Sequence, residues 1–121
     1  IGWQPYEQES HGTAQYEAWE TIQRSHAVAN GCFVVAVNRT GFEPTSPAGS
    51  YPDGIQFWGQ SFIAGPDGAI LNQASETEEG VVLASIRPKA ISEQRHGWPF
   101  LRDRRTDVYS VLTQTFLDEN P

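Results

Sequence analysis

The chain has 121 residues, of which 38% are hydrophobic and 19% are charged, and its formal net charge is −7 at pH 7. This composition is typical of one globular domain and excludes a disordered chain. The acidic balance argues against nonspecific nucleic-acid binding, which needs a basic surface. No apolar run approaches the roughly 20 residues of a membrane-spanning helix.

The charge is unevenly distributed. Residues 1–86 carry ten acids and two bases, whereas residues 87–105 carry six bases and two acids, and residues 106–121 carry three acids and no base. A basic segment inside an acidic protein more often forms a self-interface or internal ion pairs than a polyanion site.

Cys32 is the only cysteine, so the chain cannot form an internal disulfide. This favours a reducing, cytoplasmic location. Residues 1–5 lack the basic and apolar regions of a signal peptide. The chain contains no Met, which suggests a processed or partial chain.

Residues 1–12 are polar and predict a loop. A helix is predicted from Ala14 to about Asn30, with Thr13 as its N-cap and Gly31 after its end. Its expected apolar stripe comprises Tyr16, Trp19, Ile22, Ala27 and Ala29.

The segment 32–37 is almost continuously apolar and β-branched, which predicts a strand buried on both faces. Residues 39–56 lack periodicity and predict a long loop that is functional or mobile. The turn Pro66-Asp67-Gly68 predicts a hairpin of residues 60–64 and 69–73.

Farther along, residues 81–86 predict a short strand, and Pro88 suits the first turn of a helix reaching about Arg95. Residues 108–117 fit a last short helix or an extended tail. The order of elements is half of a layered α/β sandwich, because the strand at 32–37 needs cover on both faces that this chain barely supplies. This shortage indicates part of a larger domain.

Local motifs for metal binding are missing from the sequence. His11, His26 and His96 are far apart, with no Cys-x-x-Cys and no His-Glu-x-x-His, so we expect no metal. Cys32 opens an apolar strand directly after a helix end, which favours packing over nucleophilic catalysis.

Two polar features lie on the first predicted helix. His26 lies beside the apolar stripe, and we interpret it as a half-buried packing residue rather than an acid–base partner of Glu17 or Glu20. Glu20 and Arg24 have the i,i+4 order that favours an ion pair on the solvent face.

Four segments together resemble the second half of a nitrilase-superfamily amidohydrolase, closest to the N-carbamoylputrescine amidase branch, over residues 1 to about 112. They are Trp19-Glu20-Thr21-Ile22-Gln23-Arg24-Ser25-His26-Ala27, Asn38-Arg39-Thr40-Gly41, Phe57-Trp58-Gly59-Gln60-Ser61-Phe62 and His96-Gly97-Trp98-Pro99-Phe100-Leu101-Arg102-Asp103-Arg104-Arg105. The resemblance implies an α/β fold, the C-terminal half of a four-layer αββα sandwich. Residues 1–12 would be a pocket loop, 13–105 the helix and strand layers, and 106–121 a C-terminal tail.

The resemblance implies a cysteine-dependent hydrolase of non-peptide C–N bonds that uses a Glu–Lys–Cys set and no cofactor. The implied reaction hydrolyses an N-carbamoyl amine such as N-carbamoylputrescine, or a related amide, with release of ammonia. The three catalytic positions of the family precede residue 1. The resemblance therefore implies no catalytic residue in this chain, and Lys89, its only lysine, does not match the catalytic one.

The resemblance also implies the residues that face the substrate, namely Trp3, Gln4, Phe57 and Trp58. Plant N-carbamoylputrescine amidases have a Glu at the position of Gln4 that can meet the distal ammonium of the substrate. A neutral amide cannot make that charge-assisted contact, although Glu7 or Glu9 could substitute. For Trp3, core packing is the alternative.

The expected interface comprises Trp98, Arg102, Arg104 and Arg105, which resemble a tail motif of intersubunit or core ion pairing. The expected partners are a small-molecule substrate, the N-terminal half of the same domain and a second copy in a homo-oligomer, with no nucleic acid and no membrane. Two alternatives stay open. The chain could be a noncatalytic assembly module that folds against a partner chain, or a small ligand-binding domain that uses residues 39–56.

Overall fold

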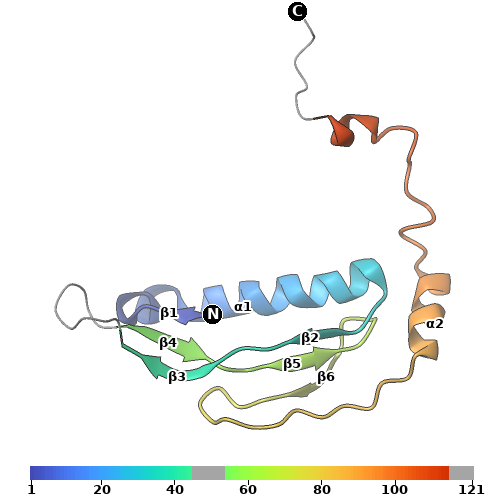
Figure 1. The fold of residues 1–121 in the computed structure, drawn as a ribbon. Coiled ribbons are helices and arrows are strands. Elements are labelled where there is room, and N and C mark those ends of the chain that lie inside the picture. Colours follow the sequence, from blue (N-terminus) through green and yellow to red (C-terminus); the bar gives the residue numbers. More distant parts are fainter. Residues whose placement is uncertain (45–53, 115–121) are drawn as a thin grey trace, which may run out of the picture.

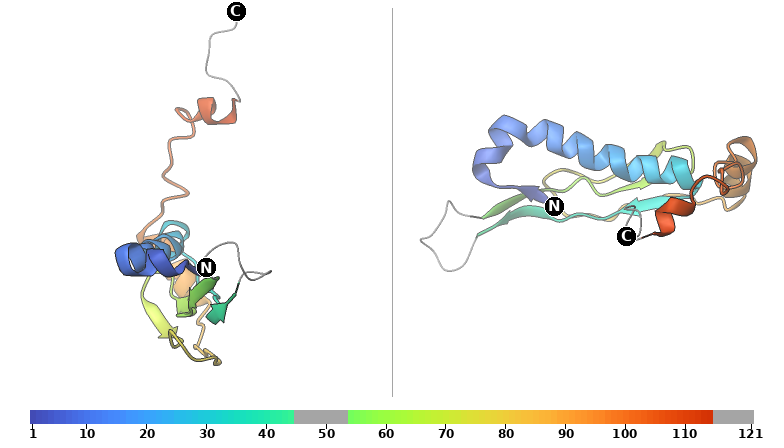
Figure 2. Two further views of the ribbon diagram at one scale, coloured as in Figure 1. Left: turned by 90° about the vertical axis from the view of Figure 1, so that its left-hand side faces the viewer. Right: turned by 90° about the horizontal axis from the view of Figure 1, so that it is seen from above.

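The computed structural model describes residues 1–44 and 54–114. Helix α1 (Pro5–Asn30) lies along one face of a long antiparallel sheet (Figure 1). We call this part, residues 1–44 and 54–73, the body of the molecule. The later segment of the chain contains α2 (Lys89–Gly97) and the 3-10 helix η1 (Ser110–Thr113), which project beyond the sheet (Figures 1 and 2). The layering of helix on sheet confirms the α/β class. None of the helices in the described ranges has the length and apolar character that crossing a membrane requires.

The described residues form two three-stranded antiparallel sheets, in the orders β1-β4-β3 and β2-β5-β6. The strands are β1 (Gly2–Trp3), β2 (Val34–Ala36), β3 (Thr40–Glu43), β4 (Ile55–Trp58), β5 (Phe62–Ala64) and β6 (Ile70–Gln73). Figure 1 shows β2 continuing into β3 and β4 into β5.

The two sheets are the ends of one continuous ribbon. Ala36 pairs with Phe62 in one ladder and Thr40 pairs with Trp58 in the other. The step along the chain is the same on both strands, so the register is unbroken across the gap.

Two successive left-handed residues interrupt the ladder in that gap. Gly59 has φ 57° and Gln60 has φ 54°. A Cβ at Gly59 would lie 2.5 Å from the carbonyl oxygen of Glu76, so glycine is required there by both conformation and space. This close approach brings the segment after β6 against the junction of β4 and β5.

Helix α1 begins earlier than the sequence predicts, so the prediction of a loop over residues 1–12 is wrong. Its N-cap is Gln4, Pro5 occupies the first turn, and the Glu7 carboxylate accepts a hydrogen bond from the backbone nitrogen of Gln4 at 3.0 Å. Proline at this position loses no helical hydrogen bond, and the carboxylate favours the helix start. Thr13 therefore lies inside the helix. The predicted end holds, because Gly31 closes α1 in a left-handed conformation.

The helix packs through a narrower stripe than expected. Ala27 is fully buried and Trp19 packs beside it against Ala36 and Phe62. Ile22, in contrast, is 56% exposed, and Ala29 is exposed as well. The short strands cover only one side of the helix, so residues at the margin of the stripe stay in solvent.

Strand β2 corrects the expectation of burial on both faces. Ala36 faces the helix and is buried, whereas Val35 is 59% exposed, so the strand is covered on one face and not on both.

The predicted loop over residues 39–56 is also wrong at its ends, because β3 and β4 pair there as a hairpin. The rest of that loop, residues 45–53, lies outside the described residues.

The hairpin predicted around Pro66-Asp67-Gly68 is confirmed by β5 and β6. The predicted strand at 81–86 is wrong, since this extended segment joins no ladder among the described residues. The helix after Pro88 is confirmed and runs to Gly97. In the predicted C-terminal element, only the η1 turn forms within the described part.

Candidate functional site

The predicted substrate-facing residues Trp3 and Trp58 meet beneath α1. Their ring centroids are 4.9 Å apart, and Trp58 also contacts Tyr16 and Trp19 of the helix at 6.3 and 6.0 Å. Trp58 is 2% exposed and Trp3 is 6% exposed. Such tilted and edge-on aromatic contacts stabilise a core beyond their buried area. Both rings therefore belong to an aromatic cluster between sheet and helix.

The indole N–H groups of Trp3 and Trp58 differ in their hydrogen-bond partners. Trp3 Nε1 donates to the Gly12 carbonyl oxygen at 3.1 Å, which ties β1 to α1. Trp58 Nε1 is buried and finds no acceptor among the described residues. A buried donor without a partner is costly, so an acceptor from solvent, a ligand or another segment would stabilise this site.

Phe57 points away from this cluster, because successive side chains of a strand alternate between faces. The Arg39 guanidinium lies 4.1 Å from the centre of its ring. Arg39 is in turn paired with Glu43 at 2.7 Å. The cation over the ring and the carboxylate beside it form a charged cover on the sheet face opposite α1.

Gln4 is exposed at the start of α1. Its backbone nitrogen is held by Glu7, so of the two acids that could substitute for a carboxylate at this position, Glu7 serves the helix start. The four predicted residues thus divide between the core, the opposite sheet face and the helix N-terminus. Their assignment to a substrate pocket stays a prediction.

A polar chain runs along α1 and fastens it to the β5–β6 hairpin. Tyr16 donates to Glu20, which also pairs with Arg24 at 2.9 Å. Gln73 donates to the Tyr16 hydroxyl at 2.9 Å, and Arg24 Nε donates to the Gly68 carbonyl oxygen at 2.8 Å. Burial and then the hydrogen bond to Glu20 raise the pKa of Tyr16 to about 12. The predicted Glu20–Arg24 pair is confirmed, but it faces the hairpin rather than open solvent.

The histidine and cysteine assignments have different outcomes. His26 is exposed rather than half-buried, because the packing stripe passes through Ala27 instead. Cys32 is partly buried at the end of α1, as expected for a packing residue. Within residues 1–44 and 54–114, no group of three His, Cys, Asp or Glu side chains is placed to hold a metal ion.

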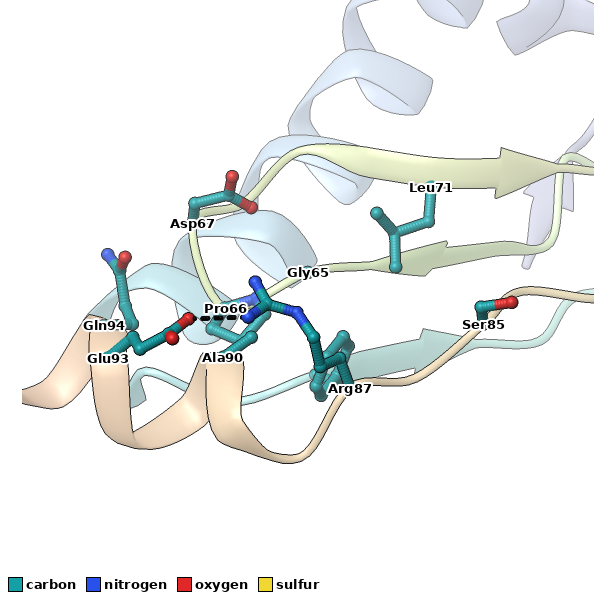
Figure 3. Close-up of a pocket in the computed structure, with 10 residues that line it drawn as sticks. Gly65, Pro66, Asp67, Leu71, Ser85, Arg87, Ala90, Glu93 and Gln94 are labelled. Atoms are coloured by element: carbon teal, nitrogen blue, oxygen red, sulfur yellow. Dashed lines mark hydrogen bonds and ion pairs between the residues drawn. The ribbon is translucent and has the colours of Figure 1, made fainter.

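A pocket of about 400 Å³ that the sequence analysis did not predict lies between the β5–β6 turn and α2 (Figure 3). Phe33, Leu71 and Ala90 supply apolar surface in it, and Arg87 donates to Glu93 at 3.0 Å on its rim. This pocket can accommodate an apolar side chain beside an ion pair. Its lining comes from segments more than 50 residues apart, which no local pattern can bring together.

The predicted interface residues lie in the segment after α2, between Trp98 and Arg105, which projects from the body. Trp98 is 61% exposed and packs against Phe100 at 5.8 Å. Arg102 and Arg105 pair with neighbouring aspartates, and Arg104 donates to the Leu101 carbonyl oxygen. Their exposure leaves them available to a partner, and the interface itself stays a prediction.

Comparison with known proteins places this fold. The carbon-nitrogen hydrolase family model matches residues 7–96. The chain is 43% identical over 96 residues to the N-carbamoylputrescine amidase of Oryza sativa subsp. japonica, a match that covers 79% of this chain and 32% of that protein. It is 36% identical over 93 residues to an omega-amidase of Homo sapiens, covering 77% of this chain and 30% of that protein.

Solved structures agree. The crystal structure of a carbon-nitrogen hydrolase from Helicobacter pylori matches with a TM-score of 0.86 at 43% identity, covering 97% of this chain and 39% of that one. The C. elegans NitFhit protein matches with a TM-score of 0.64 at 28% identity, covering 91% of this chain and 23% of that one. The chain thus spans about a third of the length of the curated relatives it matches.

Proposed function

The chain belongs to the carbon-nitrogen hydrolase family, and from this we propose that it is the C-terminal part of a cysteine-dependent amidohydrolase. The proposed reaction hydrolyses an N-carbamoyl amine such as N-carbamoylputrescine, or a related amide, and releases ammonia. It would serve polyamine biosynthesis. The observation that carries the proposal is the 43% identity to an N-carbamoylputrescine amidase over most of the chain.

In this proposal the Glu–Lys–Cys set lies in another part of the protein, and the 121-residue chain alone is inactive. The chain contributes residues 1–4 and the sheet around β4. The substrate would meet Gln4 at the exposed start of α1, whereas Phe57 is buried beneath Arg39 and would contribute from below the sheet face opposite α1. The buried Trp3–Trp58 pair would hold this surface in shape from behind.

Gln4 sets an expectation about specificity. Its amide can accept one hydrogen bond from an ammonium group but brings no negative charge, so it favours a cationic substrate less than a carboxylate does. Glu7 is engaged with the backbone of Gln4. We therefore propose that the enzyme also accepts uncharged or anionic amides, as the name of a relative that is 32% identical over 99 residues, the 2-oxoglutaramate amidase of Paenarthrobacter nicotinovorans, suggests.

The test is ammonia release by the full-length protein, with N-carbamoylputrescine and 2-oxoglutaramate as alternative substrates. The control replaces the upstream cysteine with alanine and should abolish release. Release that survives this replacement, or no release from either substrate, would reject the proposal. The variant Gln4→Glu should raise kcat/KM for N-carbamoylputrescine relative to 2-oxoglutaramate by about tenfold, the worth of one charge-assisted contact.

A noncatalytic assembly module is the second candidate. It is favoured by the exposed apolar residues of the 81–86 segment, with Val81 at 86% and Leu83 at 76% exposure. The proposed partners are the N-terminal half of the same domain and a second copy that contacts Trp98 and the three tail arginines. A reducing, cytoplasmic setting is proposed from the single Cys32. An isolated chain that is monomeric and folds cooperatively without a partner would reject this candidate.

A further inference from the structure

One side chain connects the first residue of the chain to the middle of the ribbon. Asn38 lies in the gap between β2 and β3, and its Nδ2 donates to the carbonyl oxygen of Ile1 at 2.9 Å and to that of Gly59 at 3.1 Å. Its Oδ1 accepts a hydrogen bond from the terminal amino group of Ile1. The amide of Asn38 thus pairs with both polar groups of one residue, as a neighbouring strand would. A backbone amide at Ile1 would donate the same bond.

Ser61 fixes Asn38 from the other strand of the ribbon. Its hydroxyl accepts from the Asn38 backbone nitrogen at 2.8 Å and donates to the Asn38 carbonyl oxygen at 3.1 Å. These bonds replace the ladder where Gly59 and Gln60 interrupt it. Ser61 therefore acts on the main chain of residue 38, while the side chain of residue 38 acts on residue 1.

The segment held in this way is anchored at Trp3 by the aromatic cluster and at Gln4 by Glu7, and its backbone pairing is short. Strand β1 has two residues, and among the described residues it pairs with Gln56 and Phe57 of β4 alone. Ile1 precedes this pairing and Gln4 follows it. Asn38 supplies the side-chain hydrogen bonds at the Ile1 end of this strand.

We propose that Asn38 is a positioning residue for residues 1–4, the segment that presents Gln4 to the substrate. This inference rests on the proposed function for its link to substrate, and on the hydrogen-bond geometry alone for its link to residues 1–4. Asn38 acts through the main chain of Ile1 and not on the reacting atoms. Its loss should therefore weaken substrate binding more than it slows the chemical step.

The test compares three variants of the full-length protein. Asn38→Asp keeps the size and the acceptor for Ile1 but removes both donor bonds, and Asn38→Ala is the second variant in case the new charge prevents folding. Ser61→Ala is the matched control, because it removes bonds at the same junction without touching Ile1. Hydrogen exchange of the backbone amides of residues 2–4 is measured beside kcat, KM and Tm.

In the Asn38 variants we expect faster exchange at residues 2–4 and a KM raised about tenfold with kcat changed less than about twofold, the pattern of lost uniform binding. Ser61→Ala should lower Tm and change KM and that exchange much less than the Asn38 variants do, because the side-chain bonds of Asn38 to Ile1 are kept. Unchanged exchange in the Asn38 variants, or an equal KM rise in Ser61→Ala, would overturn the inference. If the unmodified protein released no ammonia, the proposed function would fail, and the exchange result would still decide whether Asn38 positions the segment.

Discussion

The body of the molecule and the segment that follows β6 differ in how they use apolar residues. Within the described ranges, the buried hydrophobic side chains all lie between Trp3 and Ala64. In the later segment Leu83 and Trp98 are largely exposed, and α2 buries no residue. Exposed apolar side chains in this number are costly unless something covers them. The body therefore forms its own core, whereas the later segment forms none within the described residues.

The largest expected effect is in the body. Trp58→Ala should destabilise the full-length protein by about 3–5 kcal/mol, because it empties the centre of the aromatic cluster. Urea unfolding measures this loss. Tyr6→Ala, at an exposed position of α1, is the control and should stay within about 0.5 kcal/mol. Equal effects of the two variants would mean that the cluster is not the core.

The next prediction tests whether the later segment is covered. Leu83→Ala in the full-length protein should cost about 2–5 kcal/mol if another part of the protein packs on this side chain. The measurement is again urea unfolding. A loss below about 0.5 kcal/mol would mean that the residue stays in solvent, and the contrast between the two regions would then be a permanent property of the protein.

The stability of the folded state should depend on pH through Tyr16. Because the pKa of Tyr16 is raised from 10 to about 12 in the folded state, the folded state favours the neutral phenol. Its contribution is fully present below pH 10 and is lost as the pH rises through 12, by up to about 2 kcal/mol once partial solvent exposure is allowed for. Tyr16→Phe should remove this decline in Tm between pH 10 and 12, and Tyr6→Phe should keep it. A decline that survives Tyr16→Phe would assign it to other groups.

The smallest effect concerns the fastening of α1 to the hairpin. Arg24→Gln should cost about 1 kcal/mol, since it breaks the bond to Gly68 and the pair with Glu20 on a partly exposed side chain. Arg102→Gln, on the projecting segment, should change the Tm by less than the error of measurement in the absence of a partner. A larger loss at Arg102 than at Arg24 would show that the tail arginine is engaged in an assembly.

Sequence patterns located most of the elements. The hairpin around Pro66-Asp67-Gly68 and the end of α1 at Gly31 could be predicted because proline and glycine fix local backbone conformation. The start of α1 was missed, although Pro5 two residues before Glu7 is a helix-start signal in its own right. The hairpin of β3 and β4 was hidden by the prolines and glycines between its strands.

The candidate site, too, could be predicted only in part. The motif resemblance selected Trp3, Gln4, Phe57 and Trp58, and the comparisons confirm the family from which that selection came. Local patterns could not show that the two tryptophans pack together while Phe57 turns to the other face. That division depends on strand register, which is set by pairing partners distant in the sequence.

The α/β class, the hairpin turn and the family could be inferred from the order of the amino acids, because turn chemistry and motif identity are local properties of the chain. Packing in three dimensions determined that two short sheets form one ribbon in unbroken register, and that Asn38 and Ser61 bridge its gap. It also decided which apolar residues are buried. Val35 and Leu83 are as apolar as Ala36 or Phe62, and what separates them is whether another segment reaches them. Burial is a property of pairs of surfaces, so one strand cannot specify it alone.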